Sequence, residues 1–163
     1  LPIEHTARTV PGRPQERPTG QLSDLTVRRL DGTKVRRDTQ QRPTVYLVFS
    51  PNCAVAHAIT SAWRALQADP ALRAWDFVGL AWDDDSPNAV HEFRVRHQLN
   101  VSDVFLVAFD EFRKATGVVM TPAIVAVDSS GRIRLVAQGW FEAGGDRHDE
   151  LVRHLSRLVG PGD

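Results

Sequence analysis

The sequence of 163 residues contains a single cysteine, a single methionine and no excess of either charge. One cysteine, Cys53, excludes an internal disulfide and therefore a disulfide-stapled fold. Lysine plus arginine and aspartate plus glutamate number 20 each, and no basic block occurs, which argues against a nucleic-acid partner. No apolar run approaches the roughly 18 residues that would span a bilayer.

The composition that remains is that of an ordinary globular protein, with 42% hydrophobic and 25% charged residues, and it suffices for one core. Residues 1–20 hold four of the ten prolines and show no apolar periodicity. Proline locks φ and donates no hydrogen bond, so we expect an extended tail or linker there. Residues 21–160 are expected to form a single domain.

From residue 21 onward, apolar patterns predict alternating strands and helices. Asp31-Gly32 between two strand-like runs predicts a hairpin within residues 25–38. Further strands are expected at 44–49, 76–82 and 103–108, and a second hairpin at 123–137. Helices are expected at 53–67, 87–97, 111–116 and 149–159. This order predicts an α/β fold with a central mixed sheet flanked by helices on both faces.

The first expected helix opens at Cys53, directly after the strand-ending turn Ser50-Pro51-Asn52. Its apolar face is expected to consist of Val55, Ile59, Trp63 and Leu66. Unpaired N–H groups give a helix N-terminus a partial positive charge, and such a site favours the thiolate, which is the form that attacks a disulfide. We therefore interpret Cys53 as an accessible nucleophile rather than a small buried hydrophobe.

Three features together resemble the thioredoxin superfamily, and its extracytoplasmic redoxin branch of the TlpA, ResA and MauD type in particular. They are the strand–turn–Cys53 segment, Thr121-Pro122 before a later strand, and the hairpin that follows this proline. The resemblance covers about residues 21–159. It implies a thioredoxin-like fold with the 25–38 hairpin as an N-terminal β-hairpin addition. It also implies an extracytoplasmic protein, periplasmic or membrane-anchored, and a removed signal peptide or an anchor upstream of Leu1 would fit this location.

The resemblance also implies roles for individual residues. Cys53 falls on the attacking thiol, and Pro122 falls on a cis-proline that lies against it. The backbone of Thr121 would pair with an extended segment of the substrate, which Pro51 and Asn52 would also contact. The implied activity is thiol–disulfide exchange on a partner protein that carries a disulfide or a thiol, without a cofactor or a metal.

The sequence departs from this family at Ala56, which stands where the resolving cysteine is expected. A mixed disulfide on Cys53 would then have no second thiol in the chain to release it. Either the protein is naturally monothiol or Ala56 is an engineered replacement, and we slightly favour the second interpretation. Two other departures are Asn52 in place of a tryptophan and Leu47 in place of a buried carboxylate, so proton handling must differ.

Other interpretations stay open. Cys53 and His57 have the i, i+4 spacing of a metal-ligand pair, as in a Sco-like copper carrier, although no third ligand is evident and a solvated His57 is the simpler expectation. A redox-inactive scaffold would bind an extended peptide beside Pro122. A one-Cys peroxiredoxin would place Ser50 three residues before its cysteine, but its longer loop is missing. The acidic run at 83–85 is expected to be a solvated loop and helix cap rather than a metal site.

Overall fold

The computed structural model describes residues 14–16, 22, 25–36 and 42–159. Most of the predicted tail, residues 1–13 and 17–20, lies outside the described residues, as do residues 37 and 38 of the expected hairpin and residue 160 at the expected end of the domain. Residues 14–16 are the described part of the expected tail.

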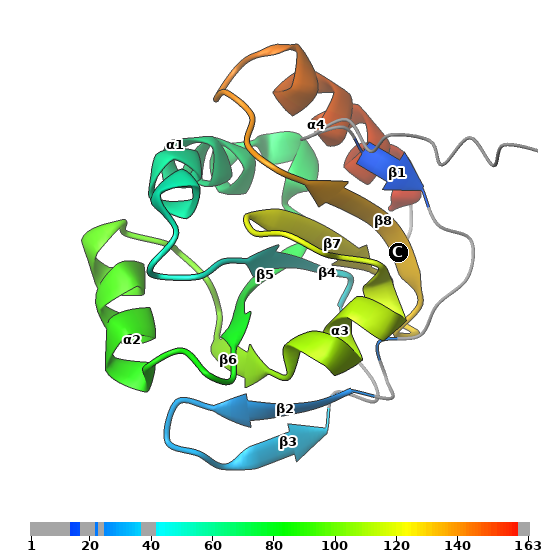
Figure 1. The fold of residues 1–163 in the computed structure, drawn as a ribbon. Coiled ribbons are helices and arrows are strands. Elements are labelled where there is room, and N and C mark those ends of the chain that lie inside the picture. The colour runs from blue at the N-terminus through cyan, green and yellow to red at the C-terminus, as the bar shows by residue number, and fades with distance from the viewer. Residues whose placement is uncertain (1–13, 17–21, 23–24, 37–41, 160–163) are drawn as a thin grey trace, which may run out of the picture.

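The described residues form one mixed sheet of eight strands in the order β1-β8-β7-β4-β5-β6-β2-β3 (Figure 1). Strand β4 lies in the middle, parallel to β5 and antiparallel to β7, and β5 is parallel to β6. The strands are β1 (Pro14–Glu16), β2 (Thr26–Arg29), β3 (Lys34–Arg36), β4 (Thr44–Val48), β5 (Asp76–Trp82), β6 (Val104–Val107), β7 (Ala123–Val127) and β8 (Ile133–Gln138). The predicted central mixed sheet is confirmed.

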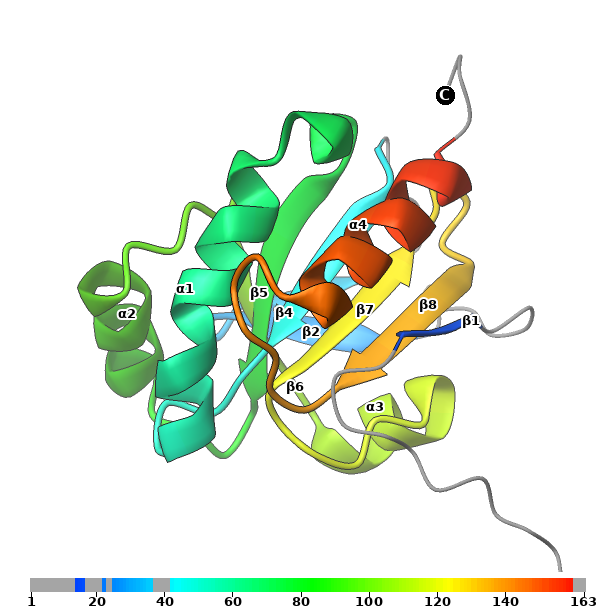
Figure 2. The same cartoon turned by 90° about the horizontal axis from the view of Figure 1, so that it is seen from above.

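Helices cover both faces of the sheet, as the order of elements predicts. They are α1 (Ala54–Ala68), the 3₁₀ turn η2 (Pro70–Leu72), α2 (Pro87–Arg96), α3 (Phe109–Thr116) and α4 (Asp146–Leu158). Helices α1 and α4 lie against one face and α3 against the other (Figure 2). Helix α3 begins two residues before the expected start at Glu111, and α4 begins three residues before Asp149. In both helices acidic side chains occupy the first turn, where the helix dipole favours them.

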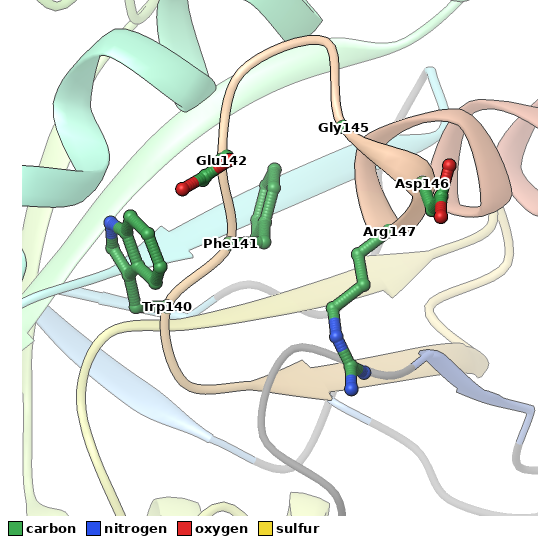
Figure 3. A pocket seen from close by; sticks show the side chains of 6 residues that line it. All are labelled: Trp140, Phe141, Glu142, Gly145, Asp146 and Arg147. Carbon is green, nitrogen blue, oxygen red and sulfur yellow. The ribbon is translucent and has the colours of Figure 1, made fainter.

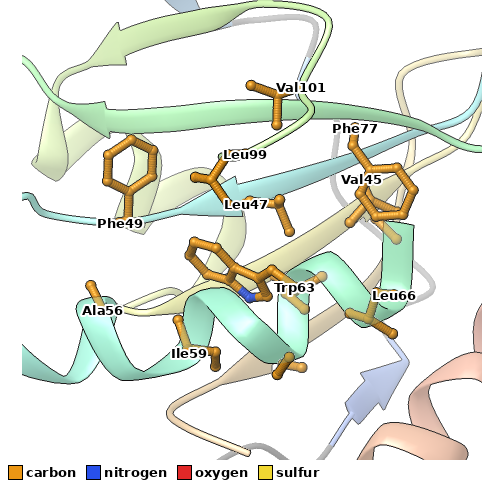
Figure 4. Packing of buried hydrophobic residues seen from close by; sticks show 14 of the residues in the cluster. Val45, Leu47, Phe49, Ala56, Ile59, Trp63, Leu66, Phe77, Leu99 and Val101 are labelled. Carbon is orange, nitrogen blue, oxygen red and sulfur yellow. The ribbon is translucent and has the colours of Figure 1, made fainter. Parts of the chain in front are cut away.

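Strand β4 is buried on both sides, which explains its unbroken apolar sequence. Alternate side chains of a strand point to opposite faces. Val45 and Leu47 accordingly pack in the cluster beneath α1 and α4, whereas Tyr46 and Val48 pack in the cluster on the α3 side. Figure 4 shows Trp63 reaching from α1 toward Leu47 of β4. The two clusters hold the central strand, and with it the start of α1, in a fixed position.

The buried face of α1 differs from the expected one at Val55, the first of its four predicted residues. Ile59, Trp63 and Leu66 are each at most 1% exposed, but Val55 is 44% exposed. Ala56 is the first fully buried residue of the helix. The core therefore covers α1 only from Ala56 onward, and the opening turn, which includes Val55, faces solvent.

Both edges of the sheet carry N-terminal segments. The expected hairpin is present as β2 and β3, and β2 pairs antiparallel with β6. At the opposite edge β1, which lies within the expected tail, pairs with β8 so that Pro14 lies opposite Ala137. Proline is tolerated in a strand at a sheet edge because its missing N–H need not enter a ladder. Part of the expected tail thus extends the sheet.

The burial difference within α1 predicts different costs of truncation at two positions one turn apart. Ile59→Ala should lower the free energy of unfolding by about 2–5 kcal/mol because it leaves a cavity in the core. Val55→Ala should change it by less than about 0.5 kcal/mol because the side chain is largely in solvent. Urea denaturation of both variants measures this difference. Equal losses of unfolding free energy would show that Val55 is part of the core.

Candidate functional site

The turn after β4 delivers Cys53 to the start of α1. The backbone N–H of Cys53 donates to the carbonyl of Ser50 at 3.1 Å, which closes the turn. Cys53 itself is the N-cap of α1, with extended backbone angles of φ −90° and ψ 118°. Pro51 within the turn is buried and Asn52 is exposed. Cys53 therefore lies at a helix N-terminus with a half-buried side chain.

Pairing of β4 with β7 brings a segment 68 residues away to the same thiol. The register places Val48, the last residue of β4, opposite Ala123, the first of β7. The chain just before β7 therefore lies beside the turn just after β4. The Sγ atom of Cys53 lies 3.9 Å from the carbonyl oxygen of Thr121, and the Thr121–Pro122 peptide bond is cis.

The N-terminus of α1 has neither a side-chain cap nor an acidic residue to offset its partial positive charge. Neither Cys53 nor any other side chain caps it by a hydrogen bond, and no acidic residue occupies its first turn. The partial positive charge of the first N–H groups is therefore not neutralised from within the helix, and it favours an anion at the N-cap. Ala56 lies in the same turn with its side chain fully buried.

Exposed apolar side chains occur on the chain segments that meet near the thiol. Val55 follows it in α1, Val119 and Met120 precede Thr121, and Trp140 follows the turn in which Gly139 N–H donates to the Pro122 carbonyl at 2.8 Å. Their exposed fractions run from 43% for Trp140 to 57% for Val119. We call Val55, Val119, Met120 and Trp140 the apolar rim.

Trp140 also lines a recess of about 280 Å³ at the loop between β8 and α4 (Figure 3). The other lining residues are Phe141, Glu142, Gly145, Asp146 and Arg147. None of the residues predicted for the site lines this recess. Trp140 is the one residue that belongs both to the recess and to the apolar rim.

His57 is not the solvated side chain that the sequence favoured. Its Nε2 atom lies 2.8 Å from the carbonyl oxygen of Pro51, and its Nδ1 atom lies 2.6 Å from Nε2 of His97 on α2. Both nitrogens are thus engaged away from Cys53, which does not favour the Cys53–His57 metal pair. Among the described residues, no group of three or more His, Cys, Asp or Glu side chains is arranged to hold a metal ion.

The acidic run after β5 is only partly a solvated loop. Asp83 is exposed and pairs with Arg28 at 3.6 Å, and Ser86 rather than an aspartate caps α2. Asp85, however, accepts hydrogen bonds from the Trp82 N–H at 3.2 Å and from the Ser50 hydroxyl at 3.4 Å. Partial burial raises the pKa of Asp85 above its ordinary value. A carboxylate therefore supports the turn before Cys53, which sequence spacing did not indicate.

No family model and no curated protein matches this sequence. Solved structures do match it across most of its length. A thiol:disulfide interchange protein of the thioredoxin family from Chlorobium tepidum is 20% identical, with a TM-score of 0.60 over 90% of this chain and 99% of that one. The chain has a thioredoxin-like fold.

Two further proteins share this thioredoxin-like fold. A secreted Mycobacterium tuberculosis disulfide oxidoreductase homologous to E. coli DsbE is 24% identical, with a TM-score of 0.59 over 82% of this chain and 96% of that one. A SCO1/SenC family lipoprotein from Bacillus anthracis is 18% identical, with a TM-score of 0.64 over 86% of this chain and 95% of that one. The fold is thus shared with proteins of more than one kind. In the described part of this chain no helix has the length and apolar character to cross a membrane.

The His57–His97 contact predicts how stability varies with pH. Burial, followed by the positive charges of His57, Arg96 and Arg64, lowers the pKa of His97 from 6.5. The unfolded chain then binds more protons than the folded protein below about pH 6.5, so the free energy of unfolding falls as the pH decreases through this range.

Urea denaturation between pH 7.5 and 5 measures this slope. In His97→Gln the slope should be shallower, because the group that resists protonation is gone. His91→Gln, at an exposed position of the same helix, should keep the slope of the parent protein. An unchanged slope in His97→Gln would show that another group is responsible.

Proposed function

We propose that the protein takes part in thiol–disulfide exchange, with Cys53 as the thiol that attacks a disulfide of a partner protein. The observation that carries the proposal is the position of Cys53, half-buried at the uncapped N-terminus of α1 and 3.9 Å from the Thr121 carbonyl beside Pro122. The similarity to solved disulfide oxidoreductases supports the same assignment.

The reaction begins with the thiolate of Cys53, whose proton has passed to solvent. The sulfur attacks one sulfur of the partner's disulfide, a new bond forms between Cys53 and the partner, and the other partner sulfur leaves as a thiolate that takes up a proton. Since Ala56 has no thiol, release of the partner requires attack by the partner's own freed thiol or by an external thiol. The protein as given is therefore suited to capture or isomerise a disulfide rather than to complete a reductive cycle alone.

The partner is proposed to approach as an extended segment. The backbone of Thr121 precedes β7 and lies next to the sulfur, where a substrate strand could pair with it. The exposed side chain of Asn52 would contact the same segment, whereas Pro51 is buried and would act by shaping the turn. The apolar rim supports a protein substrate, because exposed apolar side chains on segments next to a thiol offer a surface that a polypeptide can bind.

A second candidate is a redox-inactive scaffold that binds the same kind of segment. Ala56 in place of a resolving cysteine, together with the apolar rim, favours it. The copper-carrier interpretation has the SCO1/SenC neighbour in its favour, but the engaged nitrogens of His57 count against a pair with Cys53. We further propose an extracytoplasmic location, periplasmic or membrane-anchored, in line with the secreted protein and the lipoprotein among the neighbours.

The exchange hypothesis predicts that the protein accumulates a mixed disulfide. Incubation with glutathione disulfide at pH 7.5 should attach one glutathione per chain, because Cys53 can attack and no second thiol can displace the adduct. Mass spectrometry measures the adduct, which dithiothreitol should remove. Cys53→Ser is the control without the thiol. A chain that stays unmodified while a denatured sample reacts would favour the inactive scaffold.

Ala56→Cys should restore a full reductive cycle. The position is fully buried in the first turn of α1, so a thiol there would be shielded from solvent and one turn from Cys53. We expect at least about a tenfold increase in the rate of insulin reduction by dithiothreitol, because the second thiol resolves the mixed disulfide.

Ala62→Cys is the matched control for this experiment. It adds a thiol at a position that is 1% exposed on the same helix but two turns farther from Cys53. It should leave the insulin rate near that of the parent protein. If Ala56→Cys folds and gives no more activity than Ala62→Cys, the exchange hypothesis is wrong.

A further inference from the structure

Two histidines from different helices meet directly behind the turn that presents Cys53. His57 lies in the second turn of α1, and its backbone N–H donates to the Cys53 carbonyl at 3.3 Å. His97 follows the last residue of α2, and its Nδ1 atom lies 3.3 Å from the Thr60 hydroxyl. The imidazole rings meet at an angle of 62° with centroids 4.8 Å apart. Phe93 packs against both rings, at 4.9 Å from His57 and 4.5 Å from His97.

The positions of the protons in this contact follow from the atoms around it. The Pro51 carbonyl can only accept, so Nε2 of His57 carries a proton and donates it. If both rings are neutral, Nδ1 of His57 is bare and accepts from Nε2 of His97. Nδ1 of His97 is then bare as well. The Thr60 hydroxyl can donate to this nitrogen at 3.3 Å, because the His57 carbonyl at 3.0 Å also accepts a backbone N–H within α1.

The contact also accommodates one additional proton. Nδ1 of His97 then donates to the Thr60 oxygen, the Thr60 hydroxyl donates to the His57 carbonyl, and one proton lies between the two rings. A second additional proton would place two N–H groups head to head across 2.6 Å, which the contact cannot accommodate. The geometry thus admits a neutral pair and a pair with one positive charge, but not a pair with two positive charges.

The surrounding charges also oppose a second proton on the pair. Arg64 on α1 and Arg96 on α2 oppose a further positive charge, and with burial they lower the pKa of His97. Glu92 and Arg96, which carry opposite charges, line the small cleft of about 170 Å³ beside His57. Asp85 reaches the turn from the other side through Ser50.

We propose that His57 and His97 form a one-proton pair whose charge positions the Pro51–Cys53 turn and modulates the reactivity of Cys53 with pH. As the pH falls, a proton added to the pair lies next to the Pro51 carbonyl, which Nε2 of His57 contacts at 2.8 Å, two residues before Cys53. The new charge favours the thiolate just as bulk acidity disfavours it. The two histidines are positioning residues, since they act through the turn and the field rather than by contact with a substrate.

The proposal goes beyond the proposed function, because it requires only that Cys53 reacts as a thiolate. It is tested by the rate of Cys53 alkylation with iodoacetamide between pH 4.5 and 9, which needs no partner disulfide. The parent protein should lose less than tenfold in rate per pH unit across the range in which the pair titrates. In His57→Gln, which retains an N–H donor for the Pro51 carbonyl but cannot be charged, the loss should return to about tenfold per unit.

At pH 6 His57→Gln should react about three- to tenfold more slowly than the parent protein, the range expected for one unit charge near the sulfur in a solvated site. His91→Gln, exposed on α2, should follow the parent curve. A purely structural pair would lower the thermal stability of the variants without changing the shape of the alkylation curve, and this result would overturn the proposal.

A second readout does not depend on Cys53. Imidazole ¹⁵N resonances of the folded protein should show His57 and His97 taking up one proton between them. A second proton should bind only at a pH where the His57–His97 contact is lost. Two independent titrations, each complete near pH 6.5 in a protein that stays folded, would exclude the shared proton. Because neither measurement uses a disulfide substrate, failure of the exchange hypothesis would leave this result intact.

Discussion

The antiparallel pairing of β4 with β7 is the constraint on which the site depends. Cys53 reaches its position from one strand and Thr121 from the other, and the register that sets Val48 opposite Ala123 is what brings the sulfur within 3.9 Å of the Thr121 carbonyl. Both strands are fully buried between two apolar clusters, so a one-residue shift in register would move every side chain of a strand to the opposite face. Packing of the core therefore fixes the geometry of a surface site.

The chemistry at this site is limited by what surrounds the sulfur. The uncapped helix N-terminus favours an anion, and the apolar rim favours contact with a polypeptide, so a partner's disulfide would meet a nucleophile and a binding surface together. Because Ala56 carries a methyl group and no thiol, the chain itself cannot resolve a mixed disulfide on Cys53. In the proposed exchange, such a site would hold its partner covalently until the partner's own freed thiol or an external thiol attacks.

Much of the fold could be predicted from sequence because its signals are local. The run from Thr44 to Phe49 is apolar on both faces, and Asp-Gly and Ser-Gly turns mark the two hairpins. Burial at the ends of helices and strands is harder to predict, because it depends on how far neighbouring elements extend. Val55 has the spacing of a core residue but lies in a helical turn that the sheet does not cover. Strand β1 could not be predicted either, because three residues with a proline pair only where an edge strand such as β8 happens to lie.

The His57–His97 pair marks the limit of sequence reasoning most clearly. Its members are 40 residues apart on two helices, and their contact depends on Phe93, which stacks on Phe49 with centroids 4.5 Å apart and so holds α2 against the strand end. Beneath the site Leu47 is fully buried in the core, where the resemblance would place a carboxylate. An apolar floor cannot exchange a proton, so any titratable group that serves the turn must lie to its side. The boundary between α1 and α2 has the room and the polar partners for such a group, and the two imidazoles occupy it.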